Sequence, residues 1–100
     1  MFESIVSTNP IVILDIYADW CQPCKAMKPH MAVVAENNPH ITFLAVRVEE
    51  LDEFGMNNIR REVNAVPTLM MFHKGAFVKV HHGGMKADAL NSWVLTTQDA

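Results

Sequence analysis

The sequence predicts an α/β domain in which about four strands form a mixed central sheet flanked by helices. Apolar runs of strand length alternate along the chain with stretches whose apolar residues recur at helical spacing. The last two apolar runs are separated only by Lys74-Gly75, which predicts an antiparallel hairpin. The chain has 100 residues, enough for one hydrophobic core, so residues 1–100 are expected to form a single domain.

The chain is expected to begin with a short helix followed by a buried strand. Residues 2–8 are predicted to be helical up to Asn9-Pro10, where the proline prevents continuation. The apolar run 11–17 predicts a buried strand, and Asp15 is the one carboxylate inside it. Burial should raise the pKa of this carboxyl group and allow it to exchange a proton near neutral pH. A buried aspartate held by hydrogen bonds is the structural alternative.

A longer helix is predicted from about residue 22 to residue 36. Apolar residues recur in it at spacings of three and four and would form its buried face: Cys24, Met27, Met31 and Val34. Pro29 is expected to kink the helix, and Asn37-Asn38-Pro39 to end it.

The next strand is predicted at 41–48, where the run is apolar on both faces until Arg47, as is typical of a parallel strand covered on both sides. Residues 49–56 are expected to be a solvated acidic connection, followed by a short helix at 57–62.

The C-terminal part is predicted to contain the hairpin strands 68–73 and 76–81 and a last helix from about 86 to 97. The residues expected on the inner face of that helix are Ala87, Leu90 and Val94.

The chemistry is indicated by Trp20-Cys21-Gln22-Pro23-Cys24-Lys25, which contains the only two cysteines of the chain. The motif lies where the strand 11–17 ends and a helix begins, so its two thiols can approach the Cα separation of roughly 5.5 Å that a disulfide needs. The positive end of the helix dipole favours a thiolate at Cys21, which is expected to be the exposed attacking nucleophile. Cys24 is expected to be the resolving thiol. Pro23 suits the first helical turn, which can spare an N–H group.

Two other interpretations of the cysteine pair compete with redox chemistry. A zinc site needs four ligands, but the chain has no second cysteine pair and no evident histidine pair, so no metal site is expected. A purely structural disulfide would close so short a loop that it removes little chain entropy.

These residues resemble the thioredoxin family, and the resemblance extends over nearly the whole chain. Four landmarks occur in the family's order: 14–25 with its tryptophan and dithiol, Pro29 in the helix, Val66-Pro67-Thr68 before a strand, and Gly83 near the position of the glycine that flanks the family's substrate groove. The resemblance implies the thioredoxin fold. It also implies that Trp20, Val66, Pro67 and Gly83 contact the substrate, with Pro67 in a cis peptide bond and the Val66 backbone pairing with an extended substrate strand. Asp15 matches the carboxylate that exchanges a proton with the second cysteine.

The sequence departs from the family pattern in ways that affect the site. Gln22 replaces a common glycine, and together with Pro23 it is expected to modulate thiolate stability. Relatives place a lysine near the buried carboxylate at one of two positions, which here are Ala45 and Lys28. Lys28 is therefore either a partner of Asp15 or a plain surface lysine.

The largest departure is at the N-terminus, where too few residues precede the strand 11–17 to supply the family's usual first strand. The strand 41–48 should then lie at an edge of the sheet. Three arrangements of that edge remain open: residues 2–8 cover it in an extended conformation, the edge pairs with a second copy, or the edge is hydrated. A monomer with a hydrated edge is the expectation.

Composition excludes several classes of function. Half of the residues are hydrophobic, 19% are charged and the net charge is −3, without a basic cluster. Nucleic acid and membrane partners are therefore not expected. The N-terminus lacks the basic region of a signal peptide, so a cytoplasmic location is expected.

The expected function is reduction of disulfides in protein substrates by dithiol exchange, without a bound cofactor. The resemblance implies that an external thioredoxin reductase would re-reduce the Cys21–Cys24 disulfide. Two alternatives remain: an oxidant or isomerase that uses the same dithiol, and a thioredoxin-fold binding subunit of a larger complex.

Overall fold

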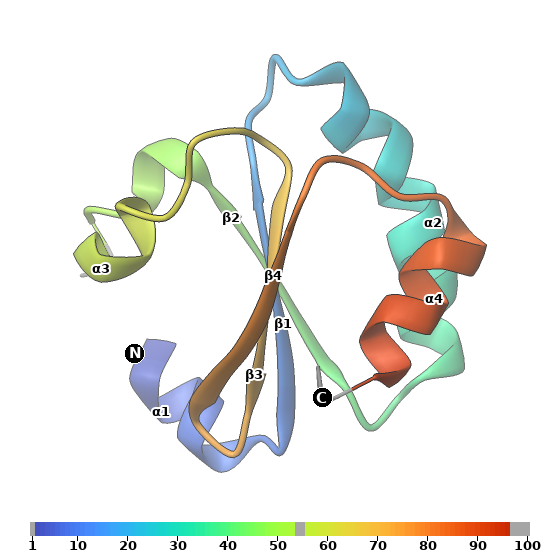
Figure 1. Cartoon of the computed structure of the whole chain (residues 1–100), viewed down its shortest axis with the longest axis horizontal. Coiled ribbons are helices and arrows are strands. Elements are labelled where there is room, and N and C mark those ends of the chain that lie inside the picture. The colour runs from blue at the N-terminus through green and yellow to red at the C-terminus, as the bar shows by residue number, and fades with distance from the viewer. Residues whose placement is uncertain (1, 54–55, 97–100) are drawn as a thin grey trace.

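A mixed sheet lies at the centre of the molecule. The computed structural model describes residues 2–53 and 56–96, and in these ranges it has four strands in the order β2-β1-β3-β4 (Figure 1). The strands are β1 Ile11–Tyr17, β2 Thr42–Arg47, β3 Thr68–His73 and β4 Ala76–His82. β1 and β2 are parallel, whereas β3 is antiparallel to both of its neighbours. The mixed sheet predicted from the sequence is confirmed.

Helices cover both faces of this sheet. Helix α2 Gln22–Asn37 and helix α4 Ala87–Leu95 lie on one face. Helix α1 Phe2–Thr8, a 3-10 helix at Val48–Glu50 and helix α3 Asn57–Arg60 lie on the other (Figure 1).

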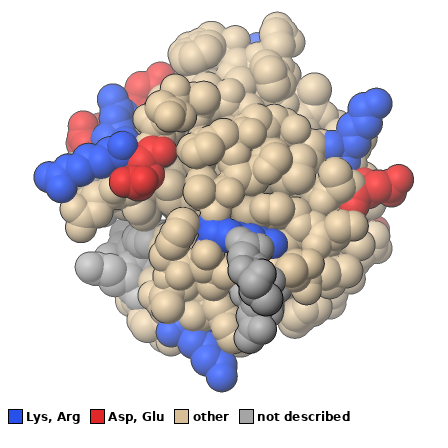
Figure 2. All heavy atoms as spheres, viewed as in Figure 1, with Lys and Arg blue, Asp and Glu red and all other residues tan. Residues whose placement is uncertain are grey.

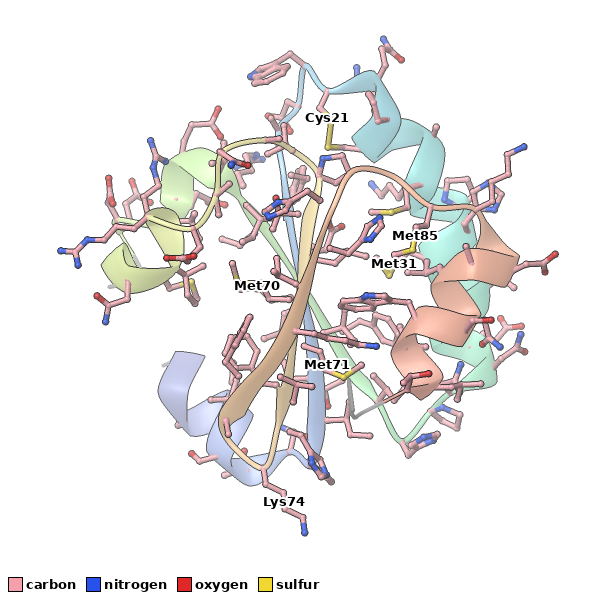
Figure 3. All side chains as sticks on the ribbon, viewed as in Figure 1. Cys21, Met31, Met70, Met71, Lys74 and Met85 are labelled. Atoms are coloured by element: carbon pink, nitrogen blue, oxygen red, sulfur yellow. A yellow bond between two sulfur atoms is a disulfide. The ribbon has the colours of Figure 1, made fainter. Side chains whose placement is uncertain are left out.

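Two cores result from the alternation of side chains along the strands. Met70 and Met71 are neighbours on β3 and point to opposite faces of the sheet (Figure 3). The core beneath α1 and α3 contains Val6, Val12, Leu14, Ile16, Leu51 and Met70. The core beneath α2 and α4 contains Ile13, Met27, Val34, Met71, Leu90 and Val94.

The predicted element boundaries are close to the observed ones. α1, β1 and β3 have the predicted bounds, α2 ends one residue later, and β4 continues to His82. α3 ends at Arg60 rather than at residue 62, and α4 begins at Ala87 and ends at Leu95. Residue 97, predicted to be helical, lies outside the described residues. Pro29 lies inside α2, as expected.

The hairpin turn depends on glycine. Lys74 and Gly75 have φ values of 52° and 85°, and two consecutive positive φ values match the twist of an antiparallel pair. Gly75 adopts this conformation without the steric cost that a Cβ atom adds.

The acidic connection at 49–56 was expected to be solvated, and this expectation is wrong for part of it. Leu51 is 0% exposed and packs in the core beneath α1 and α3, and Met56 is also buried there. The connection is held against the sheet because these two apolar side chains insert into the core. Residues 54–55 of this connection lie outside the described residues.

Among the described residues, strand β2 is the outermost strand on its side of the sheet, as predicted. α1 is helical, so the described N-terminal residues do not form a strand over this edge. The expectation that both faces of the strand are covered holds only in part. Leu44 and Val46 pack into the core on one face and Phe43 packs against the core on the other, but Ala45 is exposed. The helices reach β2 only in part because it has no outer neighbour in the described ranges.

Charged side chains are scattered on the face that Figure 2 shows, mostly around its rim, and no basic patch gathers over β4. No helix in the described ranges is long and apolar enough to cross a membrane.

Candidate active site

The cysteine motif lies at the junction of β1 and α2. Cys21 is the N-cap residue of α2, with extended backbone angles, and its Sγ accepts a hydrogen bond of 3.1 Å from the backbone N–H of Cys24. Pro23 occupies the first turn, where a missing N–H costs nothing. The helix therefore begins with the sulfur of Cys21 aligned with its free N–H groups.

Cys21 and Cys24 form a disulfide, with their Cα atoms 5.3 Å apart. Figure 3 shows it at the end of the molecule where α2 begins. The short spacing and the helical turn thus bring the two sulfur atoms into bonding contact, as the motif predicted.

Cys21 was expected to be exposed, and in this disulfide form that expectation is wrong. Cys21 is 3% exposed and Cys24 is 8% exposed. Cys21 packs with Ala18, and its Sγ lies 3.6 Å from the carbonyl oxygen of Val66. The loop that precedes β3 covers Cys21, and this contact joins segments distant in the sequence.

Other predicted site residues surround this sulfur. Trp20 is 71% exposed, so it is not a core residue. The Val66–Pro67 peptide bond is cis, as expected. Gly83, with a φ of 101°, donates its N–H to the Pro67 carbonyl oxygen at 2.8 Å. The structure therefore places Val66 against Cys21 and joins Gly83 to the neighbouring Pro67 by a backbone hydrogen bond.

Asp15 lies beside the disulfide on β1. Its Oδ1 is buried and has no hydrogen-bond partner among the described residues. Desolvation by burial raises the pKa of Asp15 from 3.8 to about 6. The expected rise in its pKa is confirmed, whereas the hydrogen bonds of the structural alternative are not found in the described ranges.

A hollow of about 290 Å³ adjoins Asp15 and Cys24. It lies between α2 and the edge strand β2, and its lining includes Lys25, Lys28 and Ala45. Within the described residues, no ion pair joins Lys28 to Asp15. Lys28 therefore shares the cavity with Asp15 without being bonded to it.

The sequence interpretation missed this hollow. Ala45 is the register partner of Asp15 on the neighbouring strand, so a small side chain stands where a larger one would occupy the space. The signal was an alanine in a strand otherwise rich in large apolar residues, combined with the parallel pairing register.

The remaining predicted residues lie on the surface near the start of α2. Gln22 and Pro23 are both exposed. In the described ranges, no three His, Cys, Asp or Glu side chains gather closely enough to bind a metal ion.

The fold and the site together define an α/β domain that carries a disulfide at a strand–helix junction. A family model described as Thioredoxin matches residues 1–96. Thioredoxin-1 of Saccharomyces cerevisiae is 36% identical over 74 residues, which are 74% of this chain and 69% of that protein. Thioredoxin C-3 of Corynebacterium nephridii is 31% identical over 94 residues, or 93% of this chain and 63% of that protein.

A solved structure agrees with these matches. The oxidised form of mitochondrial thioredoxin 3 from Saccharomyces cerevisiae superposes with a TM-score of 0.81 at 28% identity, covering 94% of this chain and 85% of that one. The chain belongs to the thioredoxin family. It spans 53% of the mitochondrial thioredoxin-2 of Schizosaccharomyces pombe, with which it is 34% identical over 74 residues, and 63% of the Corynebacterium relative.

Proposed function

We propose that this protein is a thiol-disulfide oxidoreductase that reduces disulfides in other proteins through Cys21 and Cys24. The observation that carries the proposal is the Cys21–Cys24 disulfide at the N-terminus of α2, beside the exposed Trp20. A purely structural role explains the disulfide less well, because a bond that closes so short a loop adds little stability.

The reaction uses two exchange steps. In the reduced protein, the Cys21 thiolate attacks a substrate disulfide and expels one substrate thiolate, which leaves a mixed disulfide. Cys24 then attacks the sulfur of Cys21, which forms the Cys21–Cys24 disulfide and releases the second substrate thiol. The substrate gains two electrons and the protein loses two.

The surroundings suit these two roles. The Cys24 N–H and the helix dipole stabilise negative charge on Cys21. Asp15, with a pKa of about 6, accepts the proton of Cys24 near neutral pH. Lys28 lines the same hollow as Asp15.

Substrate binding is proposed on the surface formed by Trp20, Val66, Pro67 and Gly83. The Val66 carbonyl oxygen lies 3.6 Å from Cys21 Sγ, so a substrate segment bound along this loop would present its disulfide to Cys21. Gln22 and Pro23 are exposed beside the nucleophile and would modulate its reactivity.

A reducing partner completes the cycle. We propose an external reductase of the thioredoxin reductase type, a monomeric state, no bound cofactor and a reducing compartment such as the cytoplasm, where a dithiol stays reduced. One relative is named as a mitochondrial thioredoxin, and another carries no compartment in its name. The names of the relatives are therefore compatible with more than one compartment.

The test is reduction of a model protein disulfide with NADPH and a thioredoxin reductase, next to Cys21→Ser and Cys24→Ser variants. Turnover is expected for the unmodified protein and its loss in both variants. Absence of turnover despite a correctly folded, reducible protein would contradict the proposal.

A measured reduction potential decides between reductant and oxidant. A value near the roughly −270 mV of reducing thioredoxins supports the proposal, and one near −120 mV would indicate an oxidant. A binding subunit would instead keep its biological role when Cys21 is replaced by serine.

A further inference from the structure

A groove of about 230 Å³ adjoins the proposed substrate surface at the start of α2. It lies between α2 and the segment that joins β4 to α4. Gly83 donates its N–H to the Pro67 carbonyl oxygen, and a Cβ atom on the next residue, Gly84, would lie 3.6 Å from the carbonyl oxygen of Pro23. Gly84 and Pro23 both line the groove. The proposed substrate surface therefore continues from Pro67 across the two glycines and into this groove.

The floor of the groove is apolar. Met27 is 2% exposed and belongs to the core beneath α2 and α4, and the half-buried Met85 packs against the same core. Figure 3 shows Met85 in the half of the molecule that carries Cys21. Methionine side chains are flexible and adapt to the shape of a bound group. Because one water occupies about 30 Å³ in the liquid, the groove has room for one apolar side chain of a substrate.

The polar groups of the groove favour negative charge. Lys86 is exposed, His30 is half-buried, and none of the described residues that line the groove is acidic. The ion pairs found in the described ranges involve Arg47 and not Lys86. Asp88, close to Lys86 in the sequence, lines a separate hollow between α2 and α4. An ammonium group attracts a carboxylate and an imidazole N–H can donate to one, so an acidic side chain would find partners here.

We infer that this groove binds the part of a protein substrate next to the attacked disulfide, and that it favours an apolar residue beside an acidic one. The inference rests on the proposed function, because it names the substrate class of the same site. While Cys21 holds one substrate sulfur in the mixed disulfide, the substrate chain on one side of that sulfur crosses Gly84 and enters the groove. Met27 and Met85 contact its apolar side chain, and Lys86 pairs with its carboxylate.

The expected preference is modest because Lys86 is exposed. Ion pairs at exposed positions change a rate or an equilibrium by about two- to fivefold. The net charge of −3 acts in the opposite direction, since it repels an acidic segment. Charges are screened beyond about 8 Å at physiological ionic strength. A preference for acidic substrates therefore reports charges near the groove rather than the charge of the whole molecule.

The test measures how fast the reduced full chain reacts with short peptides whose central cysteine is bonded to 2-thiopyridine. The Cys21 thiolate attacks the peptide sulfur and releases 2-thiopyridone, which is followed by its absorbance. The peptides carry a leucine next to glutamate, glutamine or lysine, on one side of the cysteine or on the other. Each rate constant is divided by that of the same peptide with 2-mercaptoethanol, which removes differences in intrinsic reactivity.

In one of the two arrangements, the glutamate peptide is expected to react about two- to fivefold faster than the glutamine peptide, and the lysine peptide slowest. Replacing the leucine of the glutamate peptide with alanine should slow its reaction, because less apolar surface is buried. Equal normalised rates for the glutamate and glutamine peptides in both arrangements would overturn the inference.

Two pairs of variants locate the preference. Ala26→Glu places a carboxylate in the groove and should remove or reverse the ratio of glutamate to lysine peptide rates, whereas Ala32→Glu makes the same change on the exposed surface of α2 outside the groove and should retain it. Lys86→Gln should reduce the ratio. Lys74→Gln, the same change in the hairpin turn at the end of the molecule opposite Cys21, should not (Figure 3). The ratio is compared because a new charge near Cys21 changes the reactivity toward every peptide.

Thermal unfolding establishes that each variant is folded. A ratio unchanged in both groove variants, or lowered as much by the two control variants, would overturn the inference, since the preference would not arise in the groove. The two proposals fail separately. Reaction with all peptides at equal normalised rates refutes only the substrate preference, whereas a folded, reduced protein that reacts with none of them refutes the proposed function.

Discussion

Replacing Asp15 with asparagine is expected to stabilise the fold at neutral pH while slowing the redox cycle. Asp15 is half-buried, and its buried Oδ1 has no hydrogen-bond partner in the described part of the chain. Asparagine has nearly the same shape and no charge, so the change removes the cost of ionising a desolvated group and little else.

The magnitude follows from the pKa. Burial raises the pKa of Asp15 from 3.8 to about 6, and each unit corresponds to about 1.4 kcal/mol. The ionised side chain therefore costs the folded state up to about 3 kcal/mol. Because a domain of this size changes its Tm by about 4–8 °C per kcal/mol, the variant should melt about 10 °C higher or more at pH 8.

The pH dependence has a definite sign. The folded state binds the proton more tightly than the unfolded state, so Asp15 carries no penalty below about pH 3.8. The penalty grows as the pH rises and is complete above about pH 6. The difference in unfolding free energy between Asp15→Asn and the unmodified protein should therefore be near zero at pH 4 and largest at pH 8.

The assay is urea unfolding of oxidised protein at a series of pH values, with Asp19→Asn as the matched control. Asp19 is exposed and pairs with Arg47 at the surface, so its replacement should change stability by less than about 1 kcal/mol. A pH-independent difference for Asp15→Asn, or destabilisation at pH 8, would refute the argument that Asp15 is a desolvated charge.

The same variant tests the proton-transfer role. Without the carboxylate, Cys24 loses its proton acceptor, so mixed disulfides with substrate should live longer and turnover near neutral pH should fall. Unchanged turnover would show that the carboxylate is only tolerated.

Three further predictions concern the nucleophile, the connection after β2 and the sheet edge. In the reduced protein, brief iodoacetamide treatment should label Cys21 rather than Cys24, because Cys21 is the helix N-cap; preferential labelling of Cys24 in a mass map would reverse the assignment. Leu51→Ala should lower the unfolding free energy by about 2–5 kcal/mol, because this side chain is fully buried, whereas Glu49→Ala at the exposed neighbouring position should have little effect in the same urea titration. Sedimentation at micromolar concentration should give a monomer; a dimer that Phe43→Lys dissociates would show instead that the β2 edge pairs with a second copy.

Much of the fold was accessible from the sequence because its signals are local. The apolar run at 11–17 and the spacing of Met27, Met31 and Val34 each reflect a single strand or helix facing a core. The proline after Asn9 and the glycine at 75 set boundaries through backbone geometry alone.

The predictions from the sequence were wrong where the burial of a side chain depends on distant segments. The acidic composition of 49–56 concealed Leu51, whose side chain is buried by residues from α1, β1 and β3. The open face of β2 depends on how far α2 extends over Ala45, which no local pattern reports.

By itself, the sequence determined the chemistry that we propose for this protein. The spacing of Cys21 and Cys24 at the junction of a strand and a helix is sufficient for a disulfide and for a stabilised thiolate, because both depend on groups within one helical turn. Only the tertiary structure decided how that chemistry is reached. It placed Val66 against Cys21 and put Ala45 opposite Asp15, leaving a hollow beside Cys24. Solvent access and desolvation are sums over neighbours from separate segments, so they are defined only when the whole chain has packed.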